Sequence, residues 1–292
     1  MAPRITELDV DCVVDQLRTD GIFVAKDFYD DATVNRLNEE FELLLSHQFV
    51  GVKENKKRKI GRMFRVNYEK LDIKSLHSFQ SAFCLREYRE ICDRYMDINS
   101  IINNDLVATQ ELGIRGVSDH LIDALTKSHI DVLRALKFMV YLMDTNEENG
   151  AFCYARGTHA MNTRLRHRHL RCGGSIRALP AVLPADVDLD FESIQGPAGT
   201  LIIFDTDGVH RAGRMSEGTE RRILRNRCLF PNQPARKPSK YSRQWFWELR
   251  LNPMKIFAPK VPEGFVHLQE WHRMRGEQTS GEVWRPKGDA SS

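Results

Sequence analysis

The sequence predicts a mainly β protein with flanking helices, in which a double-sheet β-sandwich or jelly roll is backed by helices. Two observations support this fold class. Short apolar runs recur through the second half of the chain with glycine or proline between them, and helical patterns precede these runs. We therefore expect a single domain over residues 1–292, with a jelly-roll core at about 105–230, helical support in 1–104 and a C-terminal extension in 231–292.

The bulk composition fits a globular cytoplasmic protein. The 292 residues are 41% hydrophobic, which suffices for a sizeable core. Basic residues number 43 against 40 acidic ones, so the net charge of +3 gives no reason to expect a nucleic-acid partner. The start of the chain does not resemble a signal peptide, and no apolar run is long enough to span a bilayer. The six cysteines are scattered without a Cys-x-x-Cys pair, which favours reduced thiols. We expect no membrane partner and a monomer or homodimer.

The N-terminal region begins with a helix, a glycine turn and a strand. Residues 9–20 have a helical pattern that ends at Gly21, and the apolar run Ile22–Ala25 suits a strand. Asp30 or Asp31 can cap a second helix. The apolar residues of this helix recur three and four positions apart, at Val34, Leu37, Phe41 and Leu44. One apolar face of this kind predicts a helix packed on a sheet.

Two basic runs interrupt the pattern. The segment Lys53–Arg65 has no helical period, and it fits either a solvated loop or an anion-attracting rim over a pocket. In the second case Arg62 and Arg65 are the candidate substrate contacts, because they lie among apolar residues. The other run, residues 164–171, is interpreted as a solvated face, although both runs would also suit an anionic substrate. Residues 80–104 between the runs carry mixed helical signals.

The core strands are predicted from five runs: Leu106–Leu112, Leu136–Met143, Ala151–Ala155, Gly199–Asp205 and Arg222–Phe230. The second run is apolar almost throughout, as expected of a strand covered on both faces. Prolines at 231, 234 and 238 then end the pattern, and the tryptophan-rich residues 244–249 suggest one further helix.

A candidate metal site begins just before the second of these strands. His129 and Asp131 are two positions apart, so their side chains project to the same side of an extended backbone and can converge on one ion. His210 leaves another buried strand about eighty residues later. Two imidazoles and one carboxylate form a ligand set that leaves open positions on six-coordinate iron(II). A competing pair, His120 and Asp123, has poorer spacing for a strand and no buried strand directly behind it.

Three segments resemble one known family. Residues 136–159 (LKFMVYLMDTNEENGAFCYARGTH) look like the core signature of the phytanoyl-CoA dioxygenase-like family. Residues 20–32 (DGIFVAKDFYDDA) resemble the start of that family, and residues 196–213 (GPAGTLIIFDTDGVHRAG) resemble its distal-histidine strand. The resemblance covers about residues 15–230. It implies a double-stranded β-helix, the jelly-roll or cupin-like core, and a non-haem iron(II) oxygenase that uses 2-oxoglutarate and O2.

The resemblance also implies roles for particular residues. His129, Asp131 and His210 would be the catalytic iron ligands. Arg221, eleven residues after His210, would pair with the far carboxylate of 2-oxoglutarate, because a planar guanidinium can engage both oxygens. Arg222 should point the opposite way on a strand, which favours Arg221.

Two further residues, Gln110 and His159, occupy positions that the family pattern also marks. Gln110 lies where relatives often place an amide near the cosubstrate, although an isolated glutamine of this kind is usually an outward-facing strand residue. His159 matches the histidine of the family's Gly-Ser-His, which is chiefly a structural turn element.

The implied activity is oxidation, most simply hydroxylation, of an unactivated C–H bond of a small molecule in natural-product or secondary metabolism. Halogenating relatives carry a small residue in place of Asp131, so this chain should oxygenate. Two alternatives stay open: a catalytically silent binding protein on the same fold, and a cupin-like isomerase or hydrolase with another divalent metal. The complete ligand set argues against the first alternative, and Arg221 argues against the second.

Overall fold

The computed structural model describes residues 7–55, 60–67, 76–83, 85–96, 101–102, 105–114, 128–131, 133–171, 182–184, 189–229 and 265–267. The helices are α1 (Val10–Asp20), α2 (Asp31–Ser46), α3 (His77–Phe83), α4 (Arg86–Met96) and α6 (Thr158–Arg171). The strands are β1 (Ile22–Ala25), β2 (Val52–Glu54), β3 (Arg62–Asn67), β4 (Ile101–Ile102), β5 (Asp105–Leu112), β6 (Ala135–Tyr141), β7 (Phe152–Ala155), β8 (Val182–Pro184), β9 (Phe191–Ile194), β10 (Leu201–Asp205), β11 (His210–Ala212), β12 (Glu220–Leu229) and β13 (Phe265–His267).

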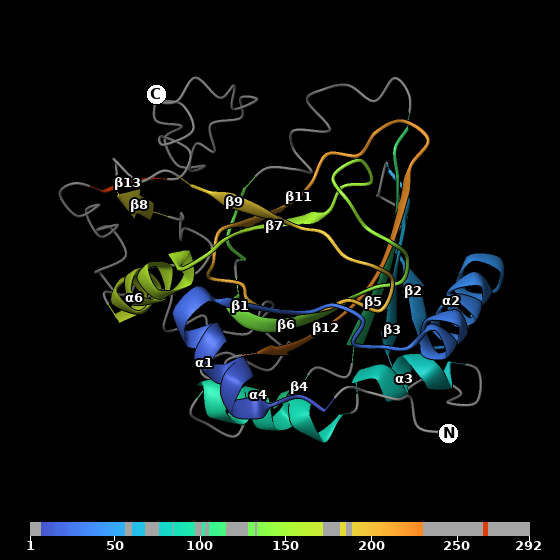
Figure 1. Ribbon diagram of the computed structural model, residues 1–292, viewed down its shortest axis with the longest axis horizontal. Coiled ribbons are helices and arrows are strands. Elements are labelled where there is room, and N and C mark those ends of the chain that lie inside the picture. Colours follow the sequence, from blue (N-terminus) through green and yellow to red (C-terminus); the bar gives the residue numbers. More distant parts are fainter. Residues whose placement is uncertain are drawn as a thin grey trace, which may run out of the picture.

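Two antiparallel sheets form the centre of the molecule. The large sheet has the strand order β1-β10-β6-β12-β5-β3-β2, with β4 paired to β12. The small sheet has the order β11-β7-β9, and Figure 1 shows it above β1, β6 and β12 of the large sheet. Strands β8 and β13 form a separate pair. The two facing sheets confirm the predicted mainly β fold class with flanking helices.

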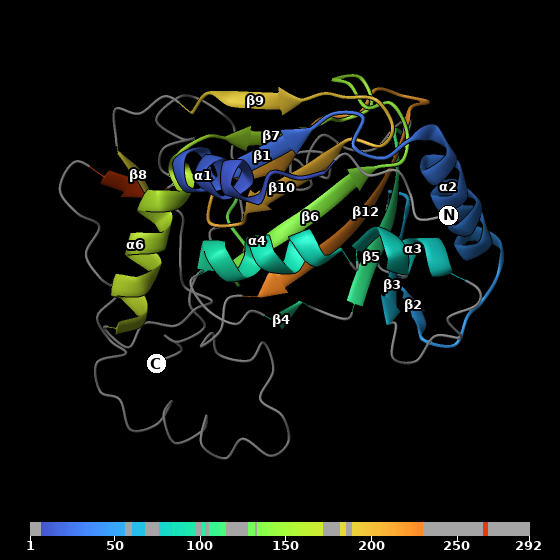
Figure 2. The ribbon, with the colours of Figure 1, turned by 60° about the horizontal axis from the view of Figure 1, so that its bottom comes forward.

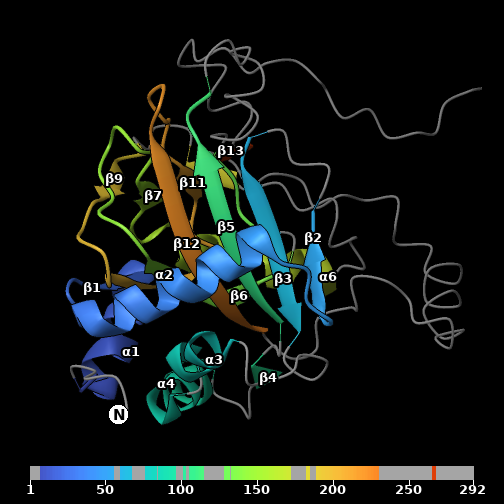
Figure 3. The ribbon, with the colours of Figure 1, turned by 90° about the vertical axis from the view of Figure 1, so that its right-hand side faces the viewer.

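The N-terminal helices cover the face of the large sheet that is turned away from the small sheet. Figure 2 shows α1 and α4 along this face, and Figure 3 shows α2 crossing β12 and β5. Alternate strand residues pack against these helices in one buried cluster that includes Leu17, Leu37, Phe41, Leu136, Phe138, Val140, Leu201 and Ile203. Burying one such side chain stabilises the fold by about 1.5–3 kcal/mol.

The opposite face of the large sheet encloses a second cluster with the small sheet. This cluster includes Met139, Tyr141, Phe152, Tyr154 and Phe204. Because successive strand side chains point to opposite faces, the odd-numbered residues of β6 face the small sheet while the even-numbered ones face the helices. The same alternation decides which candidate site residues reach the space between the sheets.

The predicted start of the fold is confirmed in detail. Asp9 caps α1 by accepting a hydrogen bond from the Cys12 backbone N–H at 3.1 Å, and Asp30 caps α2 by accepting one from Thr33 at 2.8 Å. Gly21 ends α1 with a φ of 79°. A Cβ atom at this glycine would lie 2.4 Å from the Tyr154 hydroxyl, so both backbone conformation and space require glycine here.

The interpretation of Lys53–Arg65 as a loop is wrong at both ends. Residues 52–54 form β2 and pair antiparallel with β3, which starts at Arg62. The period of two is masked because exposed charged residues such as Lys53, Glu54 and Arg65 are common in β2, the edge strand, and in its neighbour β3. Residues 56–59 lie outside the described residues.

The interpretation of residues 164–171 as a solvated face is wrong for Arg166. This run belongs to α6, and Arg166 is only 2% exposed. The competing pair His120 and Asp123 and the predicted helix at 244–249 lie outside the described residues, and the predicted domain boundaries stay a prediction. Within the described part of the chain, no helix is long and apolar enough to cross a membrane.

Candidate active site

Two segments far apart in the sequence are joined by backbone hydrogen bonds at the site. The His129 N–H donates to the His210 carbonyl at 3.0 Å, and the His210 N–H donates back to the His129 carbonyl at 2.9 Å. The Asp131 N–H donates to the Thr206 carbonyl at 3.0 Å. The segment before β6 is therefore held against the β10–β11 connection, and this contact brings the three predicted ligands together.

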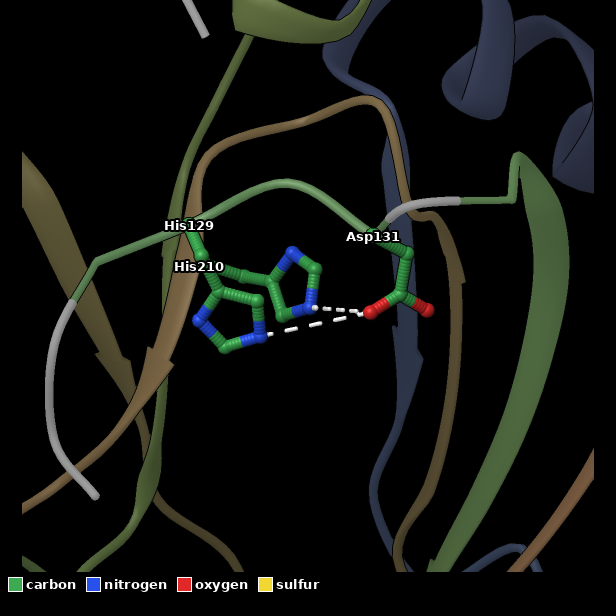
Figure 4. A group of neighbouring side chains, drawn as sticks. All are labelled: His129, Asp131 and His210. Atoms are coloured by element: carbon green, nitrogen blue, oxygen red, sulfur yellow. Dashed lines mark ion pairs between the residues drawn. The ribbon is translucent and has the colours of Figure 1, made fainter. Parts of the chain in front are cut away.

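Figure 4 shows the side chains of His129, Asp131 and His210 pointing toward one another. Oδ1 of Asp131 lies 4.0 Å from Nε2 of His129 and 3.9 Å from Nε2 of His210. One ligand atom from each residue lies within 4.8 Å of the others. Two nitrogen ligands and one oxygen ligand at this spacing can share one metal ion and leave positions open for other ligands.

The environment of His210 favours the form that binds metals. Its Nδ1–H donates to the Gly208 carbonyl at 2.8 Å, which leaves the lone pair of Nε2 facing Asp131. Burial, together with the nearby His129, lowers the pKa of His210 to about 3. The imidazole is therefore neutral near pH 7 and does not need to lose a proton before it binds a metal.

Asp131 is held between the imidazoles and a lysine. Nζ of Lys137, in β6, lies 2.6 Å from Oδ2 of Asp131, while Oδ1 faces the two histidines. Burial would raise the pKa of Asp131, but the Lys137 ammonium and the imidazoles outweigh it and hold the pKa below its usual range. Burial lowers the pKa of Lys137, and Arg225 and Arg227 add to this effect while Asp131 opposes it.

Buried ion pairs hold the two backbone segments that carry the predicted metal ligands. Arg166 of α6 donates through Nε to Oδ1 of Asp207 at 2.8 Å and through Nη2 to the Asp131 carbonyl at 2.7 Å. Arg134 donates to Asp205 at 3.0 Å, and the Tyr95 hydroxyl donates to the same carboxylate at 2.7 Å. These contacts hold the start of the connection that leads from β10 to His210, and they also hold the backbone of Asp131.

A cavity of about 260 Å³ extends from the histidines between the two sheets. Its apolar wall includes Met63, Met139, Phe152, Phe204 and Ile223. Its polar groups include Lys137, Glu111 and Arg221. A space with apolar walls and a few converging polar groups is typical of a small-molecule site.

Arg221 lies in the wall of this cavity and is only 3% exposed. Its guanidinium donates to the Gly150 carbonyl and to Glu111. Its buried Nε–H has no hydrogen-bond partner within the described part of the chain. An unsatisfied buried donor on a cation is costly, so this group fits an anionic ligand such as the carboxylate of 2-oxoglutarate.

The comparison with protein families decides the class of the chain. Residues 17–223 match the family model described as phytanoyl-CoA dioxygenase. The chain belongs to the phytanoyl-CoA dioxygenase family. Members of this family are enzymes that depend on iron(II) and 2-oxoglutarate and use O2, so the predicted enzyme class and cofactors are confirmed. No curated protein sequence matches the chain.

Solved structures with a similar fold include those of AviO1, SnoN and EctD. AviO1 from Streptomyces viridochromogenes Tue57 has a TM-score of 0.51 at 16% identity, over 78% of this chain and 98% of AviO1. The non-heme alpha ketoglutarate dependent epimerase SnoN from nogalamycin biosynthesis has a TM-score of 0.52 at 16% identity, over 75% of this chain and 82% of SnoN. EctD from S. alaskensis with bound Fe has a TM-score of 0.50 at 14% identity, over 89% of this chain and 92% of EctD. These similarities confirm the double-stranded β-helix fold.

Two residues that the sequence suggested for the site, Arg62 and Gln110, face the helices instead of the cavity, and so does Arg222, as the sequence predicted. Arg62, Gln110 and Arg222 are direct cross-strand neighbours in β3, β5 and β12. The Gln110 amide donates to Glu220 at 2.9 Å, and Arg62 donates to Glu54 at 2.7 Å and to the Leu45 carbonyl at 2.7 Å. Arg62 and Gln110 are therefore not placed to contact a ligand between the sheets.

Arg65 lies on the other face of β3, on the same side as Met63, and is exposed. The sequence grouped Arg62 with Arg65, but residues three apart on a strand point to opposite faces. Sequence reasoning also missed Lys137, Glu111 and Arg166. For Lys137 a signal existed, because a single lysine in an otherwise apolar run needs a buried partner.

Proposed function

We propose that this family member is an oxygenase that hydroxylates an unactivated C–H bond of a small molecule, with His129, Asp131 and His210 as its iron ligands. We further propose that Arg221 binds the far carboxylate of 2-oxoglutarate. One observation carries the proposal: two imidazoles and one carboxylate converge at a cavity whose wall also holds the buried Nε–H of Arg221 without a partner among the described residues.

Each part of the site has a defined task in this reaction. Iron(II), with 2-oxoglutarate and O2, supplies the oxidising chemistry when bound. The three ligands hold the metal through one side only, which leaves positions for cosubstrate and O2. Lys137 holds Oδ2 of Asp131 and so keeps Oδ1 directed at the metal position. The apolar wall with Met139 and Phe204 excludes water from the reacting carbon.

The substrate proposed from the sequence is an anionic small molecule from secondary metabolism. The similar fold of SnoN, an epimerase from nogalamycin biosynthesis, supports this biological setting. Arg65, which is exposed on the face of β3 that also carries Met63, stays a proposed contact, whereas we leave Arg62 and Gln110 out of the proposed site because of their placement. A single domain, a cytoplasmic location and a monomeric or homodimeric state also stay proposals.

The test is anaerobic addition of iron(II) and 2-oxoglutarate to the purified full chain. A weak visible charge-transfer band should appear because 2-oxoglutarate chelates the metal. The band should be lost in His210→Ala and kept in His47→Ala, which removes an exposed histidine of α2's C-terminal end. Absence of the band in the native protein would contradict the proposal.

A further inference from the structure

Strands β5 and β3 continue the large sheet beyond the strands that the small sheet faces. Figure 1 shows the small sheet above β1, β6 and β12, while β5, β3 and β2 lie to its right. On the helix side of β3, Phe64 and Val66 are at most 3% exposed. On the cavity side of the same strand, Met63 is half-buried and Arg65 is exposed. Strand β3 is therefore closed on its helix side and open on its cavity side.

The open surface is mostly apolar and continuous with the cavity. Met63 and Ile114, which lies just beyond β5, both line the cavity, and Ile114 is 44% exposed. The half-buried Val107 of β5 lies between Arg225, another cavity residue, and Arg65 in one cross-strand row. Met63, Arg65, Val107 and Ile114 are named the open floor. Among the described residues, neither Met63 nor Ile114 belongs to a buried core cluster, so packing inside the fold does not explain these apolar side chains.

The cavity is too small to enclose both the cosubstrate and a whole organic substrate. This step rests on the proposed function, in which 2-oxoglutarate reaches from the metal ligands to Arg221. The cavity measures about 260 Å³, whereas sites for drug-sized molecules alone measure roughly 300–1,000 Å³. With the cosubstrate bound, only the reacting part of a substrate fits beside the metal ligands. The rest of the substrate extends over the open floor.

The register of the sheet indicates how far such a molecule extends. Met139 of β6, Arg225 of β12, Val107 of β5 and Arg65 of β3 form one cross-strand row. Neighbouring strands lie about 4.8 Å apart, so the three steps from β6 to β3 cover about 14 Å along the sheet. A molecule that reaches from the metal ligands to Arg65 is therefore elongated, and it crosses apolar surface before it meets the arginine.

We propose that the open floor binds the apolar body of an elongated organic anion, and that Arg65 pairs with the oxyanion group at its far end. Met63, Val107 and Ile114 favour an apolar body because both surfaces lose contact with water. The planar guanidinium of Arg65 can engage two oxygens of a carboxylate or phosphate. The reacting carbon then lies at the opposite end of the molecule, beside the metal ligands.

The test uses the full chain loaded anaerobically with iron(II) and 2-oxoglutarate. Calorimetric titration with propionate, hexanoate and octanoate gives the change in dissociation constant per methylene group. Octan-1-ol is the uncharged probe, and octyl phosphate replaces the carboxylate by a phosphate. The visible band of the same samples reports whether 2-oxoglutarate remains bound. Met63→Gln and Arg65→Gln alter the floor, and Leu43→Gln and Arg89→Gln are their matched controls, because these two residues are exposed on α2 and α4 and do not line the cavity.

Each added methylene group should tighten binding to the native protein by up to about fourfold. Met63→Gln should reduce this increment, because an amide replaces an apolar contact. Arg65→Gln should keep the increment, weaken every anionic probe by about two- to fivefold and leave octan-1-ol binding unchanged. The band should be retained in all variants, and the stronger of octanoate and octyl phosphate identifies the oxyanion.

Three results would overturn the proposal: no increment with chain length, an increment that Met63→Gln leaves unchanged, or anion binding that Arg65→Gln leaves unchanged. Equal effects in the two control variants would also overturn it. A native protein with the band but without the increment would contradict the open floor and leave the proposed function in place. A native protein without the band, but with an increment that Met63→Gln reduces, would contradict the proposed function and support the open floor.

Discussion

The ammonium nitrogen of Lys137 lies 2.6 Å from Oδ2 of Asp131, while Oδ1 of the same carboxylate lies 3.9 Å from Nε2 of His210. The two oxygens of the Asp131 carboxylate thus have different partners. One is held by a lysine from the buried strand β6, and the other faces the imidazoles. A ligand with one oxygen held in this way is less free to rotate away from the metal position.

The first prediction follows from this contact. Lys137→Met should move the acid unfolding midpoint of the metal-free protein to higher pH. Burial raises the pKa of Asp131, and Lys137 is the strongest influence that lowers it, so the pKa should rise without the lysine. The stability contributed by ionised Asp131 is present above its unfolded pKa of about 3.9 and is lost as pH falls through the folded pKa. Circular dichroism during acid titration measures the midpoint, with the exposed Lys26→Met as control.

The second prediction concerns His210. Its folded pKa of about 3 lies below the unfolded value of about 6.5, so the unfolded chain binds more protons between these two pH values. The metal-free protein should therefore lose stability as pH falls from about 6.5 toward 3. His210→Asn should flatten this dependence, as measured by urea unfolding at a series of pH values. An unchanged slope in the variant would show that another group is responsible.

The third prediction tests the buried support of the ligand segments. Arg166→Met should destabilise the protein by up to about 3–5 kcal/mol, because the buried Asp207 carboxylate loses its closer cation and keeps only Arg134, whose Nε lies 3.5 Å from Oδ2. It should also weaken metal binding, because Arg166 holds the Asp131 carbonyl. Replacing both partners, as in Arg166→Met with Asp207→Leu, should recover much of the stability but not the metal affinity. Urea unfolding and metal titration of the single and double variants measure the two effects separately. Additive losses of stability would contradict the ion-pair explanation.

The fourth prediction concerns the contact between Glu111 and Arg221. Glu111→Gln should tighten 2-oxoglutarate binding, because the Glu111 carboxylate competes with the cosubstrate for the same guanidinium. Arg221→Met should weaken it by roughly tenfold or more. Gln110→Ala, one residue away on the opposite face of β5, should leave it unchanged. Titration of the visible band with 2-oxoglutarate gives all three dissociation constants, and a loss of affinity in Glu111→Gln would show that Glu111 assists binding.

Strand alternation explains both the successes and the failures of the sequence-based site. It favoured Arg221 over Arg222, and the structure places Arg221 in the cavity wall and Arg222 against α2. The same rule applied to Arg62 and Arg65 shows that only one of them can face the interior. Which of the two does so depends on the register in which β3 pairs with β5, and residues near Arg62 and Arg65 in the sequence do not determine that register.

The sequence by itself determined the local elements, because their causes are local. Asp9 and Asp30 cap helices, Gly21 ends α1, and the apolar runs form buried strands. Only the tertiary structure decided which side chains share the cavity. Arg166 looked like part of a solvated basic run, but it is buried because Asp207, 41 residues later, lies opposite it. Arg227 lies opposite Lys137, and Arg225 opposite Met139, because β6 and β12 pair in one register. Pairing between segments so far apart in the chain depends on the packing of the whole sheet.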